Sequence, residues 1–465
     1  MSKIQQTSKS PSYNLATMPL MRGHYKVLIA GSMEQIIGAA LSTVVGVMIP
    51  MIQLASATGF SSFMQGIMGA MALIGIAIGS TVIGYFADRD GYLGWFRACP
   101  LLIIAGSLLV LLFPTEPWIL IGLFLAGFGV GGGYSLDSSY ISEIMPDKWK
   151  IFMVGVAKGT CAVGFILAAV ICWAILKGYP HAAIWNQMMW IIIAMGVVAF
   201  LLRLNFTQSP EWLMEKGKTQ EAQAAARKLL GVNVTVPAPP ASPVAAAKVS
   251  YLDMFKGRNL RRVILTGIPW ACEGLGVYGF GVFLPVLVMA LGIERGTETG
   301  IDKVMNSVEM TAVINFFILP GFALGLLLIK RINHIKMLAW GFIICALGLG
   351  MLLAAYCLHL PLWVSVAGFI IFEIFLNAGP HLITFILPSQ VFPIEVRGTG
   401  SGIAAMLGKV GAVLGVFFMP MLLKWGGIVV LLWVSIGVQL LGALITIIFR
   451  PKNQTAQADV KTETK

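Results

Sequence analysis

Long runs of apolar residues, separated by short polar segments, make up most of the chain. Each run is long enough for an α-helix to cross the hydrocarbon core of a bilayer, which is roughly 30 Å thick and needs about 20 residues. Charged residues gather between the runs rather than within them. The pattern predicts twelve membrane-spanning helices, at residues 26–52, 60–86, 95–113, 117–142, 152–176, 184–205, 262–290, 308–329, 337–358, 361–390, 399–423 and 427–449.

The composition agrees with a membrane protein. Of the 465 residues, 58% are hydrophobic and only 11% are charged, whereas a soluble domain of this length exposes far more charged side chains. The six cysteines lie in or beside apolar runs and show no CxxC spacing, so we expect neither a disulfide framework nor a metal site. The sequence contains no Walker phosphate loop and no pattern typical of a nucleophile triad. We therefore expect no cofactor and no enzymatic activity.

The formal net charge of +12 is a signal of membrane topology rather than of nucleic-acid binding. If both termini are cytoplasmic, nearly all lysines and arginines fall in cytoplasmic segments. Lys177, Arg295, Lys303 and Lys424 alone fall on the external side. This bias follows the positive-inside rule. We expect a multi-pass protein of the plasma (inner) membrane, of bacterial type, with both termini in the cytoplasm.

The sequence repeats itself in two halves. "GVMIP" at 46–50 is echoed by "GVFLP" at 281–285, and "SEIMPDKWK" at 142–150 is echoed by "SQVFPIEVRG" at 389–398. Two repeated six-helix halves joined by a soluble segment are the plan of many secondary transporters. The expected organisation is a cytoplasmic tail (1–25), a six-helix half (26–205), a cytoplasmic linker (206–261) with a helix from Pro210 to Leu230, a second six-helix half (262–449) and a C-terminal tail (450–465).

"GYFADRDG" at 84–91 follows the second predicted helix. It resembles the loop motif of the major facilitator superfamily, Gly-x-x-x-Asp-Arg/Lys-x-Gly-Arg/Lys-Arg/Lys, although Tyr92 and Leu93 replace the basic pair. The resemblance implies that the aspartate holds the cytoplasmic gate shut, by accepting from a facing helix end or from a cation. The residues expected to control this gate are Gly84, Asp88, Arg89, Gly91, Glu143 and Arg397.

Four further segments resemble branches of that superfamily. "TQSPEWL" (207–213) and "GFGVGGGYSLDSSYISEIMPDKWK" (127–150) are similar to segments of sugar porters and organic-ion transporters. "NAGPHLITFILPSQVFP" (377–393) and "GKVGA" (408–412) resemble phosphate:proton symporters. The resemblance implies an all-α membrane fold of twelve transmembrane helices in two pseudo-symmetric six-helix halves.

Lys409 lies about ten residues, hence roughly 15 Å, inside the cytoplasmic end of its predicted helix. A lysine at such a depth costs roughly 2.5–3.5 kcal/mol on insertion scales, so we expect it to bind an anionic substrate. The alternative is a structural ion pair with Glu34, Asp137 or Glu273. Lys158 is the counterpart of Lys409 in the first half, and either completes an anion site or reaches back to the cytoplasmic surface.

Carboxylates inside predicted membrane helices are candidates for carrying protons. Glu34 and Glu273 lie at similar depths in the first and seventh predicted helices, and Asp137 lies one helical turn after Gly133, where phosphate symporters carry an acid. We expect one of these three acids to couple transport to protons, whereas Glu373 is expected to be peripheral. Further candidates for contact with the substrate are His381, Tyr134, Asn377 and Trp270.

These features predict a secondary transporter that works by alternating access, as a monomer, and carries a small organic or inorganic anion together with protons. The expected partners are an anionic small molecule, protons and the lipid bilayer, with no nucleic acid. A proton-coupled sugar or polyol porter is one alternative, and a drug or metabolite exporter is another. A membrane sensor would usually need a larger soluble domain than residues 206–261.

Overall fold

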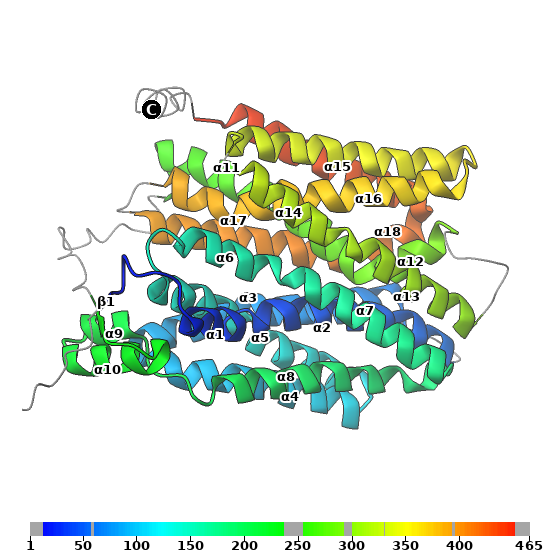
Figure 1. Cartoon of the computed structure of the whole chain (residues 1–465). Coiled ribbons are helices and arrows are strands. Elements are labelled where there is room, and N and C mark those ends of the chain that lie inside the picture. Colours follow the sequence, from blue (N-terminus) through cyan, green and yellow to red (C-terminus); the bar gives the residue numbers. More distant parts are fainter. Residues whose placement is uncertain are drawn as a thin grey trace, which may run out of the picture. The chain divides into compact units, whose positions relative to one another are not determined.

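The structure is a computed structural model that describes residues 13–56, 60–236, 254–292, 300–329, 331–392 and 396–451. Nearly all of these residues are helical (Figure 1). The chain forms two compact units. The N-terminal unit comprises residues 1–245 and 296–312, and the C-terminal unit comprises 246–295 and 313–465.

Helices of the N-terminal unit follow one another along the chain with short connections. Three of its membrane spans are built from two consecutive elements each: α1 with α2, α6 with α7, and η1 with α8. The elements are β1 (Tyr13–Asn14), α1 (Arg22–Ala30), α2 (Met33–Ala55), α3 (Ser62–Asp90), α4 (Tyr92–Leu112), α5 (Glu116–Ile144), α6 (Lys150–Gly159), α7 (Cys161–Gly178), η1 (Ala182–Met188), α8 (Met189–Arg203), α9 (Pro210–Glu215), α10 (Thr219–Leu230) and β2 (Val234–Thr235).

Helices α3 and α5 pack with their backbones in direct contact. A Cβ atom added to Gly127 or Gly131 of α5 would lie 2.0–2.1 Å from the carbonyl oxygens of Ala72 and Ile76 in α3. Only glycine permits such an approach, and small residues at helix contacts are typical of membrane proteins. The glycines of "GFGVGGG" therefore serve helix packing.

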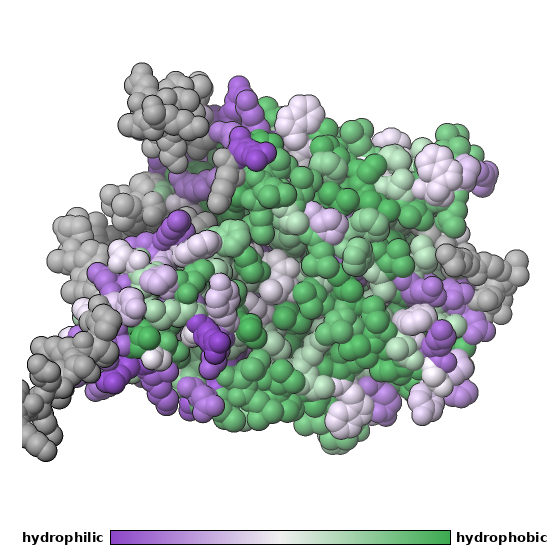
Figure 2. Space-filling model, in the orientation of Figure 1, coloured by the Kyte–Doolittle hydropathy of each residue, from purple (hydrophilic) through white to green (hydrophobic). Residues whose placement is uncertain are grey.

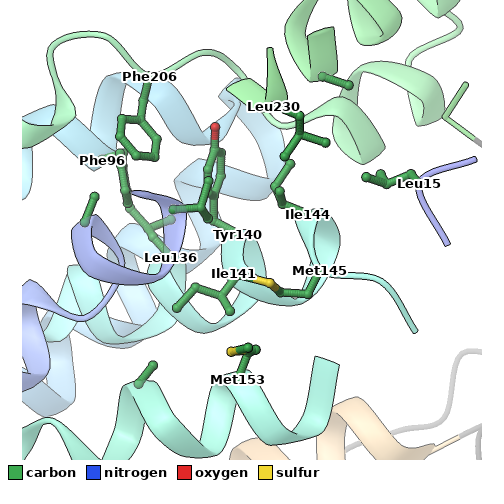
Figure 3. Packing of buried hydrophobic residues seen from close by; sticks show 14 of the residues in the cluster. Leu15, Phe96, Leu136, Tyr140, Ile141, Ile144, Met145, Met153, Phe206 and Leu230 are labelled. Carbon is green, nitrogen blue, oxygen red and sulfur yellow. The ribbon is translucent and has the colours of Figure 1, made fainter. Parts of the chain in front are cut away.

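An apolar cluster closes one end of the N-terminal unit (Figure 3). Tyr140 of α5 and Met153 of α6 pack in it together with Leu230 of α10. The segment that precedes α1 belongs to the same cluster: Leu15 is buried, and β1 pairs in parallel with β2. Residues 13–18 are thus packed against the segments around α5 and α10 rather than standing apart from them. Helices α9 and α10 lie at the same end (left in Figure 1).

The outside of this unit is apolar where lipid would cover it. Trp190, Val197, Val198 and Leu201 of α8 are exposed. In Figure 2 the hydrophobic residues form a green band along α8, with hydrophilic residues at its two ends. Large exposed apolar surface of this kind is expected of a helix that faces acyl chains.

The C-terminal unit is built in the same manner, and some of its membrane spans likewise consist of consecutive elements. A π-helical segment, η3, separates α11 from α12, and α16 ends where Gly379 and Pro380 begin α17. Pro380 has no backbone N–H to continue α16. The elements are α11 (Gly257–Gly274), η3 (Leu275–Phe280), α12 (Gly281–Ala290), α13 (Ile301–Phe316, divided between the units after residue 312), α14 (Ile318–Leu328), α15 (His334–Cys357), α16 (Leu362–Ala378), α17 (Pro380–Val391) and α18 (Arg397–Ile448).

The twelve predicted membrane helices are confirmed, with ends that move by a few residues. Eleven helices in the described part are long and apolar enough to span a membrane, and the eleventh, Thr399–Ile448, holds two spans. Gly427 separates these two spans with a left-handed φ of 65°. The prediction of one continuous helix from Pro210 to Leu230 is wrong. The chain forms α9 and α10 instead, because Gly217 has a φ of 74° between them.

The contact between α3 and α5 can be tested by adding one methyl group. Gly131→Ala should lower the stability of the purified protein, because the new Cβ meets the carbonyl of Ile76; overpacking of this kind costs about 1–3 kcal/mol. Gly94→Ala on α4 is the matched control, since no atom lies within 4 Å of its added Cβ. Thermal unfolding in detergent is the measurement. Equal melting temperatures for the two variants would contradict the packing.

Candidate functional site

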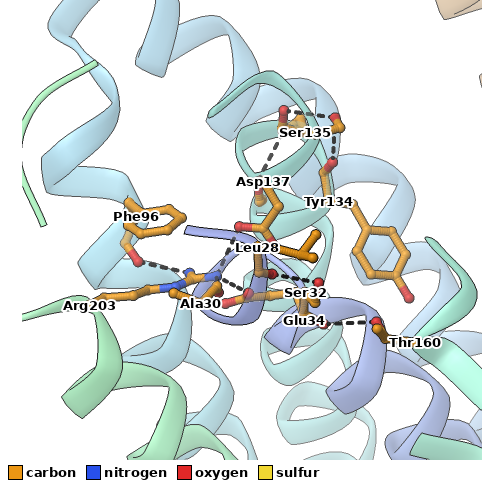
Figure 4. Close-up of polar contacts among 12 residues, drawn as sticks. Leu28, Ala30, Ser32, Glu34, Phe96, Tyr134, Ser135, Asp137, Thr160 and Arg203 are labelled. Carbon is orange, nitrogen blue, oxygen red and sulfur yellow. Dashed lines mark hydrogen bonds and ion pairs between the residues drawn. The ribbon is translucent and has the colours of Figure 1, made fainter. Parts of the chain in front are cut away.

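Three charged side chains from three helices meet inside the N-terminal unit (Figure 4). Arg203 at the end of α8 pairs with Glu34 of α2 and with Asp137 of α5. Its Nη2 atom donates to Glu34 and, at 2.8 Å, to Oδ1 of Asp137. The exposed fractions of the three side chains are 0%, 0% and 2%, respectively. We call these three residues the Arg203 triad.

Backbone groups and an aromatic ring complete the surroundings of Arg203. Its guanidinium donates to the carbonyl oxygens of Phe96 and Ala30, each at 2.9 Å, and lies 3.8 Å from the centre of the Phe96 ring. These contacts hold the planar cation in one orientation. A buried guanidinium with several acceptors is typical of a site that keeps its charge inside the membrane.

Gly133 makes room for the triad. A Cβ atom at this position would lie 2.1 Å from Cγ of Glu34. The resembling phosphate symporters carry an acid at this position, but here a side chain at position 133 would collide with Glu34. The side chain of Glu34 on α2 occupies the space that a side chain at position 133 of α5 would need.

The charges of the triad do not balance when both acids are ionised. One guanidinium faces two carboxylates, and in the described part of the structure Oε1 of Glu34 and Oδ2 of Asp137 are buried without a hydrogen-bond partner. A buried net charge is costly in a medium of low polarity. If either acid binds one proton, the remaining carboxylate balances the charge of Arg203. The protonated acid can then donate a hydrogen bond from an oxygen that otherwise lacks a partner within the described ranges. The triad is thus suited to binding and releasing a proton.

Lys158 of α6 lies in the same unit. Its Nζ atom donates to Oε1 of Gln35 at 3.4 Å and lies 5.7 Å from the centre of the Tyr134 ring. The hydroxyl of Tyr134 in turn packs against Gly38, where an added Cβ would lie 2.2 Å from it. Two of the candidate residues for substrate contact, Lys158 and Tyr134, are therefore brought together.

Lys409 of α18 makes a similar contact in the C-terminal unit. Its Nζ atom lies 3.4 Å from the hydroxyl of Tyr278 and 4.9 Å from the centre of that ring. Tyr278 comes from the π-helical segment η3. Trp270 packs beside this pair: an added Cβ on Gly408 would lie 2.6 Å from the Trp270 ring, which meets Phe385 edge-on.

A chain of buried polar side chains runs from α16 to α11 in the C-terminal unit. The Nδ2 atom of Asn377 lies 2.8 Å from the carbonyl oxygen of Glu373 and 3.2 Å from its carboxylate. Oδ1 of Asn377 lies 2.9 Å from Nδ1 of His381, and Nε2 of His381 lies 3.8 Å from Glu273. The expectation that Glu373 is peripheral is wrong, because its side chain is buried and bound to Asn377.

The structure describes the surroundings of four of the six residues expected to control the gate. Gly91 has a left-handed φ of 96°, and Gln208 fills the space beside it. Glu143 accepts a hydrogen bond from the hydroxyl of Ser209. Arg89 is exposed and pairs with the neighbouring Asp90, while Gly84 lies in ordinary contact with Ser135. The side chains of Asp88 and Arg397 lie outside the described part of the structure.

Sequence reasoning found the two acids of the triad but not the arginine. Arg203 ends an apolar run, where a cation is expected from the positive-inside rule alone. Tyr278 is an aromatic residue within an apolar run, where such side chains usually serve packing. The positions of Arg203 and Tyr278 in the sequence are those of ordinary structural residues, so the sequence does not indicate a functional role for either.

Comparisons with known proteins agree with this architecture. The family described as "Sugar (and other) transporter" matches residues 9–457. The chain belongs to this family. Among its relatives, the inner membrane metabolite transport protein YgcS of Escherichia coli is 27% identical over 94% of this chain and 93% of its own. The repressible high-affinity phosphate permease of Neurospora crassa is 24% identical over 73% of this chain and 67% of its own.

This chain is also similar to a solved structure of another transporter. The xylose transporter XylE of E. coli, in a partially occluded inward-open conformation, aligns with a TM-score of 0.76 at 17% identity, covering 93% of this chain and 98% of XylE. The chain therefore has the major facilitator fold of twelve helices in two halves. It is a multi-pass secondary transporter of small molecules, and not an enzyme.

The Arg203 triad can be tested through stability. Arg203→Gln should lower the free energy of unfolding by about 3–5 kcal/mol, because it leaves two buried carboxylates without their cation. Adding Glu34→Gln to that variant should restore part of the loss, since one of the two negative charges is then removed. Arg22→Gln, which changes an exposed arginine at the start of α1, is the control. Thermal unfolding in detergent measures all three. An Arg203→Gln protein as stable as the Arg22→Gln protein would contradict the triad.

Proposed function

We propose that this protein is a proton-coupled symporter of a small organic or inorganic anion, such as a carboxylate or phosphate. In this proposal it resides in the plasma (inner) membrane as a monomer, with both termini in the cytoplasm. Its two halves would alternate access to the substrate. The gate at the ends of α3 and α5 would use Gly84, Asp88, Arg89, Gly91 and Glu143, with Arg397 in the second half.

The observation that carries the proposal is the position of Lys409 beside the hydroxyl of Tyr278. An ammonium group and a phenol hydroxyl side by side can both donate to a carboxylate or phosphate oxygen. Tyr278 also offers the face of its ring to the cation, which lowers the cost of Lys409 in the membrane when no anion is bound. Lys158 and Tyr134 form a corresponding lysine–tyrosine contact in the N-terminal unit, and Trp270 would line the site next to Lys409.

The acids considered as ion-pair partners of Lys409 have other basic partners. Glu34 and Asp137 are bound to Arg203, and Glu273 lies 3.8 Å from His381. The pairing of Glu34 and Asp137 with Arg203 supports a ligand role for Lys409 over a structural ion pair with either of these two acids. It also assigns separate tasks to the charges: lysine for the anion, and the acids of the Arg203 triad for the proton.

A proton-coupled sugar porter is the second candidate. Gln439 of α18 is fully buried, and neither polar atom of its amide has a hydrogen-bond partner among the described residues. Amide groups of this kind suit sugar hydroxyls, which both donate and accept. Among the relatives, the arabinose-proton symporter of Bacillus subtilis is 22% identical over 85% of both chains. Transport of a labelled sugar beside labelled anions separates the two candidates.

The first experiment measures accumulation by the purified protein in proteoliposomes. Labelled phosphate, gluconate and xylose are offered with and without an inward proton gradient. We expect an anion to accumulate only with the gradient, and xylose not to accumulate. Glu34→Gln and Asp137→Asn should each abolish accumulation while keeping counterflow exchange, which needs no net proton movement.

Glu309→Gln is the control for these two variants, because Glu309 is an exposed acid on α13. Its accumulation should equal that of the wild type. Accumulation of xylose in place of the anions would favour the sugar porter. If both amide variants still concentrate an anion, the triad does not carry the proton.

The second experiment measures anion affinity at Lys409. Lys409→Ala should weaken the binding of phosphate or gluconate at least tenfold, about 1.4 kcal/mol, whereas Lys409→Arg should keep part of the affinity because the charge remains. Lys424→Ala, an exposed lysine on the same helix, should bind as the wild type does. Folding is checked by thermal unfolding of each variant. Unchanged affinity in a folded Lys409→Ala protein would remove Lys409 from the site.

A further inference from the structure

Glu373, Asn377, His381 and Glu273 form a buried chain in the C-terminal unit, whereas the Arg203 triad lies in the N-terminal unit. Glu373 and Asn377 come from α16, His381 comes from α17 and Glu273 comes from α11. All four side chains are buried. Polar side chains at this depth are costly unless each one is satisfied. The hydrogen bonds of the chain define where its protons can be.

The orientation of Asn377 follows from its neighbour Glu373. The backbone carbonyl of Glu373 can only accept a hydrogen bond, so the atom of Asn377 that lies 2.8 Å from it must be the Nδ2 donor. The amide oxygen of Asn377 therefore faces His381, at 2.9 Å from Nδ1. An amide oxygen can only accept, so Nδ1 of His381 carries a hydrogen whether the ring is neutral or charged.

The other ring nitrogen is consequently the one that gains and loses a proton. Nε2 of His381 lies 3.8 Å from Oε1 of Glu273. An unprotonated Nε2 facing an ionised carboxylate would place two acceptors against each other in a buried space. The arrangement is favourable when one proton lies on either Glu273 or Nε2, and a proton can pass between them once the two groups move from 3.8 Å to hydrogen-bond distance.

We propose that Glu273 and His381 form a second proton-binding site, in the C-terminal unit, which takes part in the coupling proposed above and rests on that function. When the proton moves, the O–H bond of Glu273 breaks and the N–H bond at Nε2 of His381 forms. A neutral pair thereby becomes a carboxylate and an imidazolium, without any further reactant. Asn377 is a positioning residue, which holds the ring so that Nε2 points to Glu273, and Glu373 fixes Asn377.

Several titratable or charged residues lie on the elements that pack against α11 and α17, which carry Glu273 and His381. In the membrane-spanning middle of these elements the titratable or charged residues are Glu373 on α16, Lys409 on α18, Tyr278 on η3, Cys345 on α15 and Cys272 on α11 itself. On the side of α14, the Phe322 ring lies 5.2 Å from the imidazole ring. Glu273 is thus the acid that directly faces Nε2, and replacing it should change the titration of His381.

The test is 15N NMR of histidine-labelled protein in lipid nanodiscs, with a pH titration and no substrate. The difference between wild type and His381→Gln identifies the signals of His381. We expect the neutral ring to carry its hydrogen on Nδ1 in the wild type. Asn377→Leu should remove this preference, because the acceptor for Nδ1 is gone.

The titration of His381 separates the pair from a merely structural histidine. Glu273→Gln should shift the midpoint of its titration, because the imidazolium loses its counter-ion. Glu309→Gln should leave the midpoint unchanged. A neutral ring with its hydrogen on Nε2, or an unchanged midpoint in Glu273→Gln, would overturn the proposal.

A transport measurement then distinguishes this site from the proposed function. Uphill phosphate or gluconate accumulation should be lost in Glu273→Gln proteoliposomes and kept in Glu309→Gln. If the titration behaves as expected but the wild type carries no anion, the proton site stands and the anion assignment is wrong. If the wild type accumulates an anion and Glu273→Gln does so equally well, the second site does not take part in coupling.

Discussion

One guanidinium group connects five helices of the N-terminal unit: α8, which carries Arg203, and α1, α2, α4 and α5, which it contacts. Arg203 binds side chains of α2 and α5 and the carbonyl oxygens of Phe96 and Ala30, on α4 and α1. Within a membrane these charges have no water to solvate them, so their mutual contacts decide whether the helices can pack in this way. The glycine at position 133 leaves the space that the side chain of Glu34 occupies beside the arginine.

The two units use different chemistry at related positions. Glu34 belongs to the first membrane helix and Glu273 to the seventh, yet Glu34 meets an arginine from α8 whereas Glu273 meets a histidine from α17. An arginine keeps its charge at every physiological pH, so the proton of that site must reside on an acid. A histidine can take the proton itself. In our account the first site balances a fixed charge and the second shares a mobile proton.

Much of the fold could be predicted from the sequence, because apolar runs of membrane length and the bias of basic residues are strong signals. The acids Glu34, Asp137 and Glu273 could also be found, since a carboxylate in an apolar run needs an explanation. Arg203 could not be found, because it lies at a helix end where an arginine is ordinary. The break between α9 and α10 follows from the left-handed φ of Gly217, a local signal that the prediction of one continuous helix did not use. The burial of Glu373 depends on contacts between segments, which local patterns do not contain.

The central claim is that an anion and protons cross the membrane together. It is tested most directly by a pH-sensitive dye trapped inside proteoliposomes that have equal pH on both sides. An inward gradient of phosphate or gluconate should acidify the interior in the wild type, and should not do so in Asp137→Asn or when xylose is added instead. Anion uptake without any acidification of the interior would contradict the account.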